Sequence, residues 1–477
     1  MKNKVRAPIV ERIAAYIAEK PVRWHMPGHK GNFGDPPLFN RLLPNAALVD
    51  AIDTMKLGDI SSQNKSIKEA EDLAAGLMQA GAARFLLNGA SQGVMAAVIT
   101  ACRMDEKILI ARNSHRSAWV ALVLSGAIPV SVPVVCHPEY GIALGVTTEA
   151  VAAAIKAHPD AKALLITSPT YNGVINDLRA IQKLTKAAGM ALIVDEAHGN
   201  SFPFSSRLPL SAQEIKASLV IHSWHKTLGT LTQAAVLLQN EMSLPLDKYL
   251  RLLNNTSPSP LLLASLDATR AWWEEKGPAL ADYTVDLALE ARAQLARIEG
   301  VHVLGLSDYP DPVKDVDITR LVISNNWNLS GFDLEDELVK RHIHIEMAES
   351  RLVTLMLTVG NQKSDIQALT EALKDIGANL PRHSKIVHSI PFPDPTVVLS
   401  PSEAYEKPTI EIPRRAAVGR IAGEMLAPYP PGIPLLVPGE LITPSIAATL
   451  EECLDIGAWI HGPEDPSCTT ITVIAKA

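Results

Sequence analysis

The sequence has no apolar run of about 18 residues and no block of basic residues. It therefore predicts neither a membrane-spanning helix nor a nucleic-acid partner. Its net charge is −7, from 44 basic and 51 acidic residues. The N-terminus begins with basic residues but has no uninterrupted apolar core. Ile9, Ile13 and Ile17 recur every four residues, which predicts an amphipathic helix rather than a secretory signal.

Cysteine is scarce, and its few occurrences form no recognisable site. Cys102, Cys136, Cys453 and Cys468 are scattered, with no Cys-x-x-Cys pair. This usage predicts a reducing cytoplasmic environment and no metal site. The sequence also lacks the Gly-x-x-x-x-Gly-Lys-Ser/Thr loop of nucleotide-binding proteins, so the "DEAH" at 195–198 does not indicate a helicase.

The 477 residues suffice for two or three domains. From residue 68 to about residue 240, helical segments alternate with short apolar strands, which predicts an α/β domain with a mostly parallel sheet. After residue 300 the pattern predicts a smaller α+β region. We expect an N-terminal arm at 1–45, a large domain at 46–300 and a C-terminal region at 301–477, with a proline-rich crossing at about 388–408.

Parallel sheets bind ligands beyond the carboxyl ends of their strands, so motifs that follow strands are candidates for a site. In "LLNGASQG", Gly89, Ala90 and Ser91 lie between a predicted strand and a helix. Such a turn suits a phosphate, although small turns at helix starts are common without one. His115 follows the strand "KILIA" and is either a stacking partner for an aromatic ligand or a surface histidine.

A carboxylate ends the apolar strand in "IVDEAHGNSF". Burying Asp195 there is costly without a partner, and a cationic heterocyclic nitrogen would be a suitable one. His198 follows three residues later. A helix cap or a metal ligand are the alternatives, but further His or Cys at ligand spacing is lacking.

Lys226 follows the strand "SLVIHS" by a few residues, in "SWHKTLGTLTQAA". Small and hydroxyl residues surround it in the sequence, which favours an imine-forming amine over a solvated surface charge. Ser223, His225, Thr227 and Thr230 are nearby candidates for binding a phosphate.

These four motifs together predict pyridoxal 5′-phosphate (PLP) as cofactor. PLP requires a lysine for its Schiff base and an acid for its pyridinium nitrogen. It also requires small-residue or hydroxyl donors for its phosphate and a group that stacks on its ring. Each motif is ambiguous alone, but four in order on consecutive α/β units are much less so.

The sequence resembles the Orn/Lys/Arg decarboxylase family of fold-type I PLP enzymes, in the short form without an N-terminal receiver-like domain. The likeness runs through "HMPGHKG", "NGASQG", "RNSHRS", "SPTYNGVINDL", "VDEAHGNSFPF", "SWHKTLGTLTQAA" and "NNTSPSPLLLASLDATR". It extends to "GRIAGEMLAPYPPGIPLLVPGELIT", a segment that aminotransferases of the same fold type do not usually carry.

The resemblance implies a fold-type I large domain with a smaller α+β C-terminal domain, and a homodimer or higher oligomer with the active site at the subunit interface. It assigns the Schiff base to Lys226, the pyridine nitrogen to Asp195 and the ring face to His115. His198 would lie near the phenolic side of the ring or the substrate. The implied phosphate contacts are Ser91, Ser223 and His225, with Thr256 and Ser257 from the neighbouring subunit.

The expected activity is decarboxylation of arginine, lysine or ornithine to an amine that feeds polyamine synthesis. Asp53, Glu424 and Glu440 are candidates for the distal cation of the substrate. The sequence departs from the family at Ala90, at Arg116 and in the region 50–67, which lacks a Pro-x-Gly turn. An aminotransferase, a decarboxylase of another amino acid and an inactive binding or regulatory relative remain alternatives.

Overall fold

A seven-stranded sheet forms the centre of the computed structural model, which describes residues 5–32, 45–50, 66–380, 395–429, 432–455 and 457–475. The strand order is β1-β10-β9-β8-β6-β2-β3. β10 runs opposite to the other six strands of this sheet, which confirms the mostly parallel α/β prediction. The strands are β1 (Ala82–Leu86), β2 (Lys107–Ala111), β3 (Ile128–Val132), β6 (Ala163–Thr167), β8 (Ala191–Asp195), β9 (Leu219–His222) and β10 (Ala235–Gln239).

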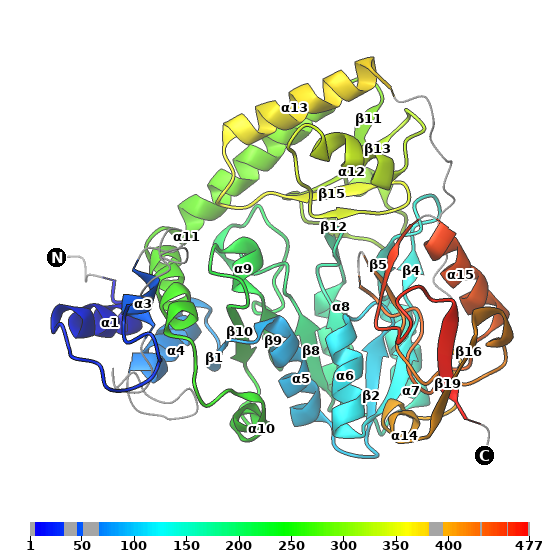
Figure 1. The fold of residues 1–477 in the computed structure, drawn as a ribbon, viewed down its shortest axis with the longest axis horizontal. Coiled ribbons are helices and arrows are strands. Elements are labelled where there is room, and N and C mark those ends of the chain that lie inside the picture. The colour runs from blue at the N-terminus through cyan, green and yellow to red at the C-terminus, as the bar shows by residue number, and fades with distance from the viewer. Residues whose placement is uncertain are drawn as a thin grey trace.

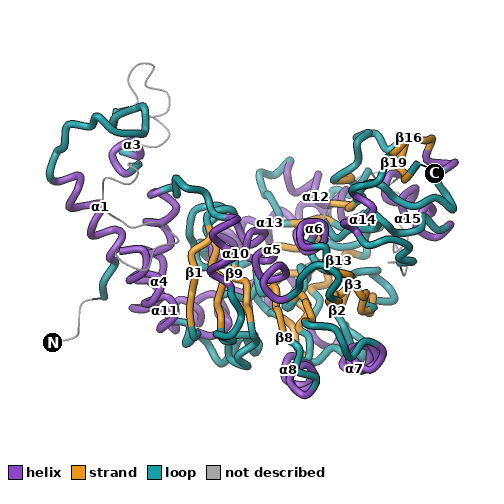
Figure 2. Tube along the Cα trace, turned by 90° about the horizontal axis from the view of Figure 1, so that it is seen from below, coloured by secondary structure: helices purple, strands orange, loops and turns teal. Residues whose placement is uncertain are grey.

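Helices cover both faces of this sheet, so its strands are buried on both sides (Figure 2). Along β6, Ala163 and Leu165 belong to one hydrophobic cluster, whereas Leu164 and Ile166 belong to the other. This alternation follows from the two-residue period of a strand. The helices of this region are α4 (Ser66–Leu77), α5 (Gly89–Ala101), α6 (Arg116–Ser125), α7 (Thr148–Ala157), α8 (Leu178–Ala187), α9 (Trp224–Thr227) and α10 (Leu246–Leu253).

The N-terminal segment forms the expected amphipathic helix α1 (Pro8–Ala18), with a short helix α3 (Ala46–Val49) further along the chain. Ile9 and Ile13 are buried, and α1 packs on α4 and on the long helix α11 (Pro260–Leu295). The Asp267 carboxylate in α11 accepts the Ile9 backbone N–H over 2.8 Å. The apolar face of α1 is therefore held against the large domain.

Helix α11 connects the large sheet to a second, four-stranded sheet with the order β11-β13-β15-β14 (Figure 1). This sheet has its own hydrophobic cluster, to which the end of α11 and two further helices contribute. Its elements are β11 (Val301–Val303), β13 (Arg320–Asn325), α12 (Gly331–Val339), β14 (Met347–Ala348), β15 (Val353–Met356) and α13 (Lys363–Ala378). Short strands β4 (Val135–Cys136), β5 (Ala143–Gly145), β7 (Val174–Ile175) and β12 (Asp315–Val316), and 3-10 turns Phe202–Phe204 and Leu306–Asp308, connect the larger elements.

The last part of the chain packs beside α6 around a separate cluster (Figure 1). The buried Arg112 at the end of β2 forms a 3.1 Å ion pair with Glu440 of this part. The elements are α14 (Pro401–Tyr405), β16 (Thr409–Pro413), a 3-10 turn Arg414–Ala416, β17 (Ala427–Tyr429), α15 (Pro444–Asp455), β18 (Trp459–His461) and β19 (Thr470–Ile474).

The proline-rich crossing predicted at 388–408 lies partly outside the described residues, since these resume at residue 395. Its second half contains the short helix α14. Ser400 and Glu403 form a capping box and Pro401 occupies the first helical position, which favours a helix start over an extended strand. In the described parts of the chain, no helix is both long and apolar enough to cross a membrane.

Candidate active site

A cavity of about 300 Å³ lies at the carboxyl ends of the large-sheet strands. All four strand-end motifs converge on it, because the carboxyl ends of parallel strands meet at one edge of a sheet. The predicted residues that line it are Gly89, Ala90, Ser91, His115, Asp195, His198, Ser223, His225 and Lys226.

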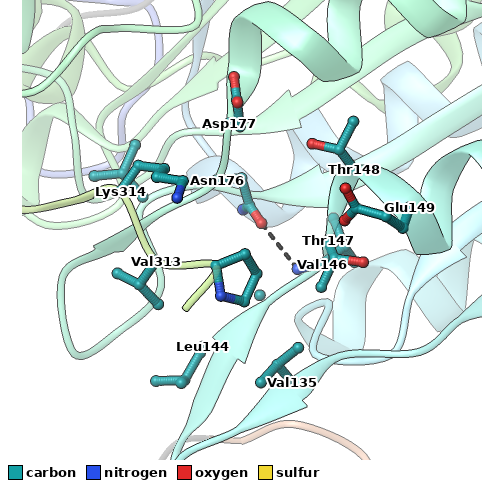
Figure 3. Close-up of a pocket in the computed structure, with 13 residues that line it drawn as sticks. Val135, Leu144, Val146, Thr147, Thr148, Glu149, Asn176, Asp177, Val313 and Lys314 are labelled. Atoms are coloured by element: carbon teal, nitrogen blue, oxygen red, sulfur yellow. Dashed lines mark hydrogen bonds between the residues drawn. The ribbon is translucent and has the colours of Figure 1, made fainter. Parts of the chain in front are cut away.

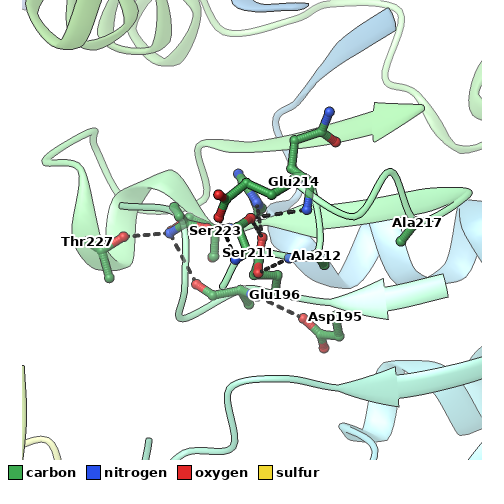
Figure 4. Close-up of polar contacts among 12 residues, drawn as sticks. Asp195, Glu196, Ser211, Ala212, Glu214, Ala217, Ser223 and Thr227 are labelled. Carbon is green, nitrogen blue, oxygen red and sulfur yellow. Dashed lines mark hydrogen bonds and ion pairs between the residues drawn. The ribbon is translucent and has the colours of Figure 1, made fainter. Parts of the chain in front are cut away.

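The turn that carries Lys226 is fixed by Asn200, which follows β8. The buried Asn200 amide donates to the Ser223 carbonyl over 2.8 Å and to the Thr227 hydroxyl over 2.7 Å. Its own carbonyl accepts the Ser223 backbone N–H over 3.0 Å. The bonded residues, Ser223 and Thr227, flank Lys226 in the sequence (Figure 4). The amine is therefore presented from a rigid single-turn helix, α9.

The charges of Lys226 and Asp195 influence each other's pKa within the cavity. Burial lowers the pKa of the Lys226 amine, while the charges of Asp195 and Glu346 oppose that shift. Burial raises the pKa of Asp195, and the Lys226 charge counteracts it. Each group thus favours the charged form of the other in a site that disfavours charge.

His198 lies between the amine and the small domain. Its Nε2 is 2.8 Å from the Lys226 Nζ, and Arg320 donates to its backbone carbonyl over 3.0 Å. The Tyr171 ring lies edge-on to the His198 ring, with 4.8 Å between the centroids. Burial first, and then the Lys226 and Arg320 charges, hold the pKa of His198 well below its usual range.

His115 caps the N-terminus of α6, where its Nδ1 accepts the Ser117 backbone N–H over 3.2 Å. Burial, and then the Lys226 and Arg116 charges, lower its pKa to about 4, so the ring is neutral at physiological pH.

Helix α5 begins at Gly89, which lines the same cavity and whose φ of +74° favours glycine. The Asn88 side chain does not cap this helix.

Glu196 points away from the cavity although it directly follows Asp195. Its carboxylate accepts bonds of 2.7 Å from the Ser211 hydroxyl and from the Ala212 N–H, and lies 2.8 Å from His222 Nε2 (Figure 4). Glu196 therefore holds residues 211–212 and the end of β9 together, and Asp195 is the acid available to a ligand.

Several residues named from the sequence do not line this cavity. Thr256 and Ser257 are exposed between α10 and α11. Glu424 accepts the backbone N–H groups of Glu464 and Thr472, and Glu440 pairs with Arg112, so neither carboxylate is available to a substrate cation. Asp53 lies outside the described residues.

Two of the cavity residues that were missed belong to a strand end. Thr167 ends β6 in direct register with Asp195, and Tyr171 follows in the quoted "SPTYNGV" segment. Applying the strand-end criterion to β6 would have found both. Arg320 was also missed, and no sequence signal connects it to His198, which is 122 residues away.

A second cavity, of about 180 Å³, holds none of the predicted site residues (Figure 3). Asn176 lines it but is engaged, because it accepts the Val146 N–H and donates to the Thr167 carbonyl. This cavity therefore offers less chemistry than the one around Lys226.

Fold and site together define an α/β enzyme of the class that includes amino acid decarboxylases and aminotransferases. Lysine decarboxylase LdcF of Francisella novicida superposes with a TM-score of 0.88 at 20% identity, covering 99% of this chain and 82% of its own. Lysine decarboxylase A of Pseudomonas aeruginosa gives 0.85 at 21% identity, covering 98% and 80%. Pyridoxamine-pyruvate aminotransferase of Mesorhizobium loti gives 0.53 at 18% identity, covering 67% and 85%.

The chain belongs to the Orn/Lys/Arg decarboxylase family. Residues 7–361 match the family's major domain and residues 382–453 its C-terminal domain. The chain is 36% identical to an arginine decarboxylase of Halalkalibacterium halodurans, covering 100% of this chain and 99% of the relative. It is 35% identical to one of Bacillus subtilis, covering 98% of each. The expected family and fold are confirmed, and the protein is a decarboxylase of basic amino acids.

Proposed function

We propose that the protein decarboxylates L-arginine to agmatine, with PLP held in the cavity around Lys226. Relatives named arginine decarboxylase, which match over nearly the whole chain, support arginine over lysine and ornithine. The observation that carries the proposal is one cavity with a buried amine at Lys226, a buried acid at Asp195 and the start of helix α5.

The residues present fit this cofactor. The buried Thr167 hydroxyl has no hydrogen-bond partner among the described residues, so it is available to a ligand beside Asp195. The first turn of α5 opens on the cavity without a side-chain cap, which suits a phosphate. Ser91, Ser223 and His225 line the same cavity as further phosphate contacts. His115, neutral and beside Lys226, is placed to lie against a ring.

When bound, PLP supplies an electron-withdrawing ring that accepts the electron pair released as the bond from Cα to the carboxylate breaks. Asp195 would keep the proton on the ring nitrogen by favouring its charged form. Lys226 would hold the cofactor before substrate enters, then carry a proton to the substrate Cα. His198, at 2.8 Å from the Lys226 amine, is placed to share that proton.

We assign the distal guanidinium of the substrate to Glu346, although this residue does not line the cavity around Lys226. It is exposed, it follows α12 in the small domain, and its charge acts on both Lys226 and Tyr171. A guanidinium binds a carboxylate through two parallel N–H bonds, which gives a pocket with this acid a preference for arginine.

We further propose a homodimer in which Thr256 and Ser257 reach the phosphate of the partner's site, because both are exposed in a single chain. The four cysteines are few and scattered and include no Cys-x-x-Cys pair, which supports the cytoplasm as the location, with agmatine feeding polyamine synthesis.

The test is a parallel assay of arginine, lysine and ornithine with PLP, measuring both CO₂ and the amine product. Arginine should give agmatine at the highest kcat/KM, and Lys226→Ala should give none. Keto-acid formation without CO₂ release would overturn the proposed reaction, and a higher kcat/KM for lysine or ornithine would overturn the proposed substrate.

A further inference from the structure

A line of three side chains runs from the small domain to the active amine, with Arg320 and His198 buried and Lys226 half-buried. The Arg320 Nη2 lies 3.3 Å from the His198 Nδ1, and the His198 Nε2 lies 2.8 Å from the Lys226 Nζ. Arg320, at the start of β13, is fully buried and forms a 3.5 Å ion pair with Asp317. The line therefore joins a strand of the second sheet to a lysine in α9, which follows β9 of the first sheet.

Hydrogen-bond chemistry fixes the direction of this line. A guanidinium has only donors, so the His198 Nδ1 that faces Arg320 must accept. A neutral imidazole carries one proton, so that proton resides on Nε2, which faces Lys226. An Nε2–H group donates, and the Lys226 nitrogen can accept only through the lone pair of an uncharged amine.

We propose that Arg320 is a positioning residue that fixes the Nε2–H tautomer of His198 and thereby keeps Lys226 as a neutral amine. This inference rests on the proposed function, because only the neutral amine has the lone pair that attacks an aldehyde carbon. The lowered pKa values of His198 and Lys226 support it, since both shifts include the positive charge of Arg320.

The surroundings hold Arg320 in place. Asp317 in turn accepts bonds from the Thr319 N–H over 2.9 Å and from the Thr319 hydroxyl over 2.6 Å. Gly173, with a φ of +85°, brings the loop after Tyr171 so close that a Cβ there would lie 3.0 Å from the Arg320 Cγ. The titratable and charged groups around Lys226 are Asp195, His198, Tyr171, His115, His225, Arg320 and Glu346.

The test measures the pKa of the Lys226 amine in the full-length, cofactor-free protein. Acetic anhydride labels the amine at a series of pH values, and mass spectrometry quantifies acetylated Lys226 against an internal amine standard. Arg320→Met should raise this pKa by about one unit, because His198 is then free to accept from a charged ammonium. Arg320→Lys keeps a charged donor and should restore most of the wild-type value. Arg341→Met, a matched change in the same domain, should leave it unaltered.

A second pair of variants distinguishes an effect that acts through His198 from a direct effect of the Arg320 charge on Lys226. In His198→Phe protein, Arg320→Met should shift the Lys226 pKa by less than half as much. An equal shift in both backgrounds would overturn the inference, and so would no shift in the first.

A measurement on the unmutated protein covers the case in which an Arg320 variant does not fold. ¹⁵N NMR of histidine-labelled protein, with His198→Phe identifying the signal, should show the Nε2–H tautomer. An Nδ1–H or doubly protonated His198 would refute the assignment. Failure of the proposed function is distinct, because it would appear as unmutated enzyme that releases no CO₂ from any basic amino acid.

Discussion

The side-chain amide of Asn200 donates a 2.7 Å hydrogen bond to the hydroxyl of Thr227, the residue directly after Lys226. The same amide group also contacts the backbone of Ser223, so one buried side chain after β8 holds the turn after β9. The geometry of the amine thus depends on a residue that need not touch any ligand.

Asn200→Ala should therefore affect stability and activity together. It leaves the buried N–H and carbonyl of Ser223 without these partners, which costs about 1–3 kcal/mol of unfolding free energy. Urea unfolding measures that loss, and kcat should fall as well because Lys226 is less well held. Asn379→Ala, at an exposed helix end, is the control, with a change below about 0.5 kcal/mol. Equal stability of the two variants would contradict the role of Asn200.

Asp195→Asn should lower kcat by several decades, equivalent to several kcal/mol in the barrier, because it keeps the size but removes the charge that favours a protonated ring nitrogen. Steady-state CO₂ release measures the effect. Asp177→Asn, at the exposed N-cap of α8, should change the rate little. A near wild-type rate for Asp195→Asn would remove Asp195 from the mechanism.

Glu346→Gln should raise KM for arginine by about tenfold, or about 1.4 kcal/mol of binding, with a much smaller effect on kcat. The reason is the loss of the charge partner for the distal guanidinium. Glu371→Gln on the exposed face of α13 is the matched control. If KM is unchanged, another group must recognise the distal cation.

Glu71 should make stability depend on pH. Burial raises its pKa from 4.5 to about 8, although its carboxylate accepts the Phe85 N–H over 2.9 Å. Between these pH values the folded state keeps a proton that the unfolded state releases. Stability is therefore lost as pH rises through this window, by about 1.4 kcal/mol per unit at most.

Glu71→Gln keeps the acceptor and removes the titration, so the stability of the variant relative to the unmutated protein should increase with pH. Denaturant unfolding at several pH values measures this difference. The exposed Glu69→Gln should show no such trend. A difference between Glu71→Gln and unmutated protein that stays constant with pH would show that the Glu71 pKa is not raised.

Much of the site could be predicted because each motif is local. Asp195 and Lys226 each follow a short apolar strand, and parallel strands place such positions at one edge of the sheet whatever the helices between them contain. The amphipathic spacing of Ile9 and Ile13 likewise predicted α1.

Assignments that depend on distant parts of the chain were less successful. Glu424 and Glu440 are acids in a family-specific segment, yet both carboxylates are bound within the protein. Whether an acid faces a substrate or a buried arginine depends on packing between remote segments, which spacing does not encode.

The succession of strands and helices along the chain, the chemistry at each strand end and the family could all be predicted, because they depend on local periodicity and residue type. Which groups meet depends on the fold. Arg320 reaches His198, and His198 reaches Lys226, because the start of β13 in the second sheet packs against the loop that follows β8 in the first. The protonation states there depend on burial and on the direction of each hydrogen bond, which exist only once the chain has folded.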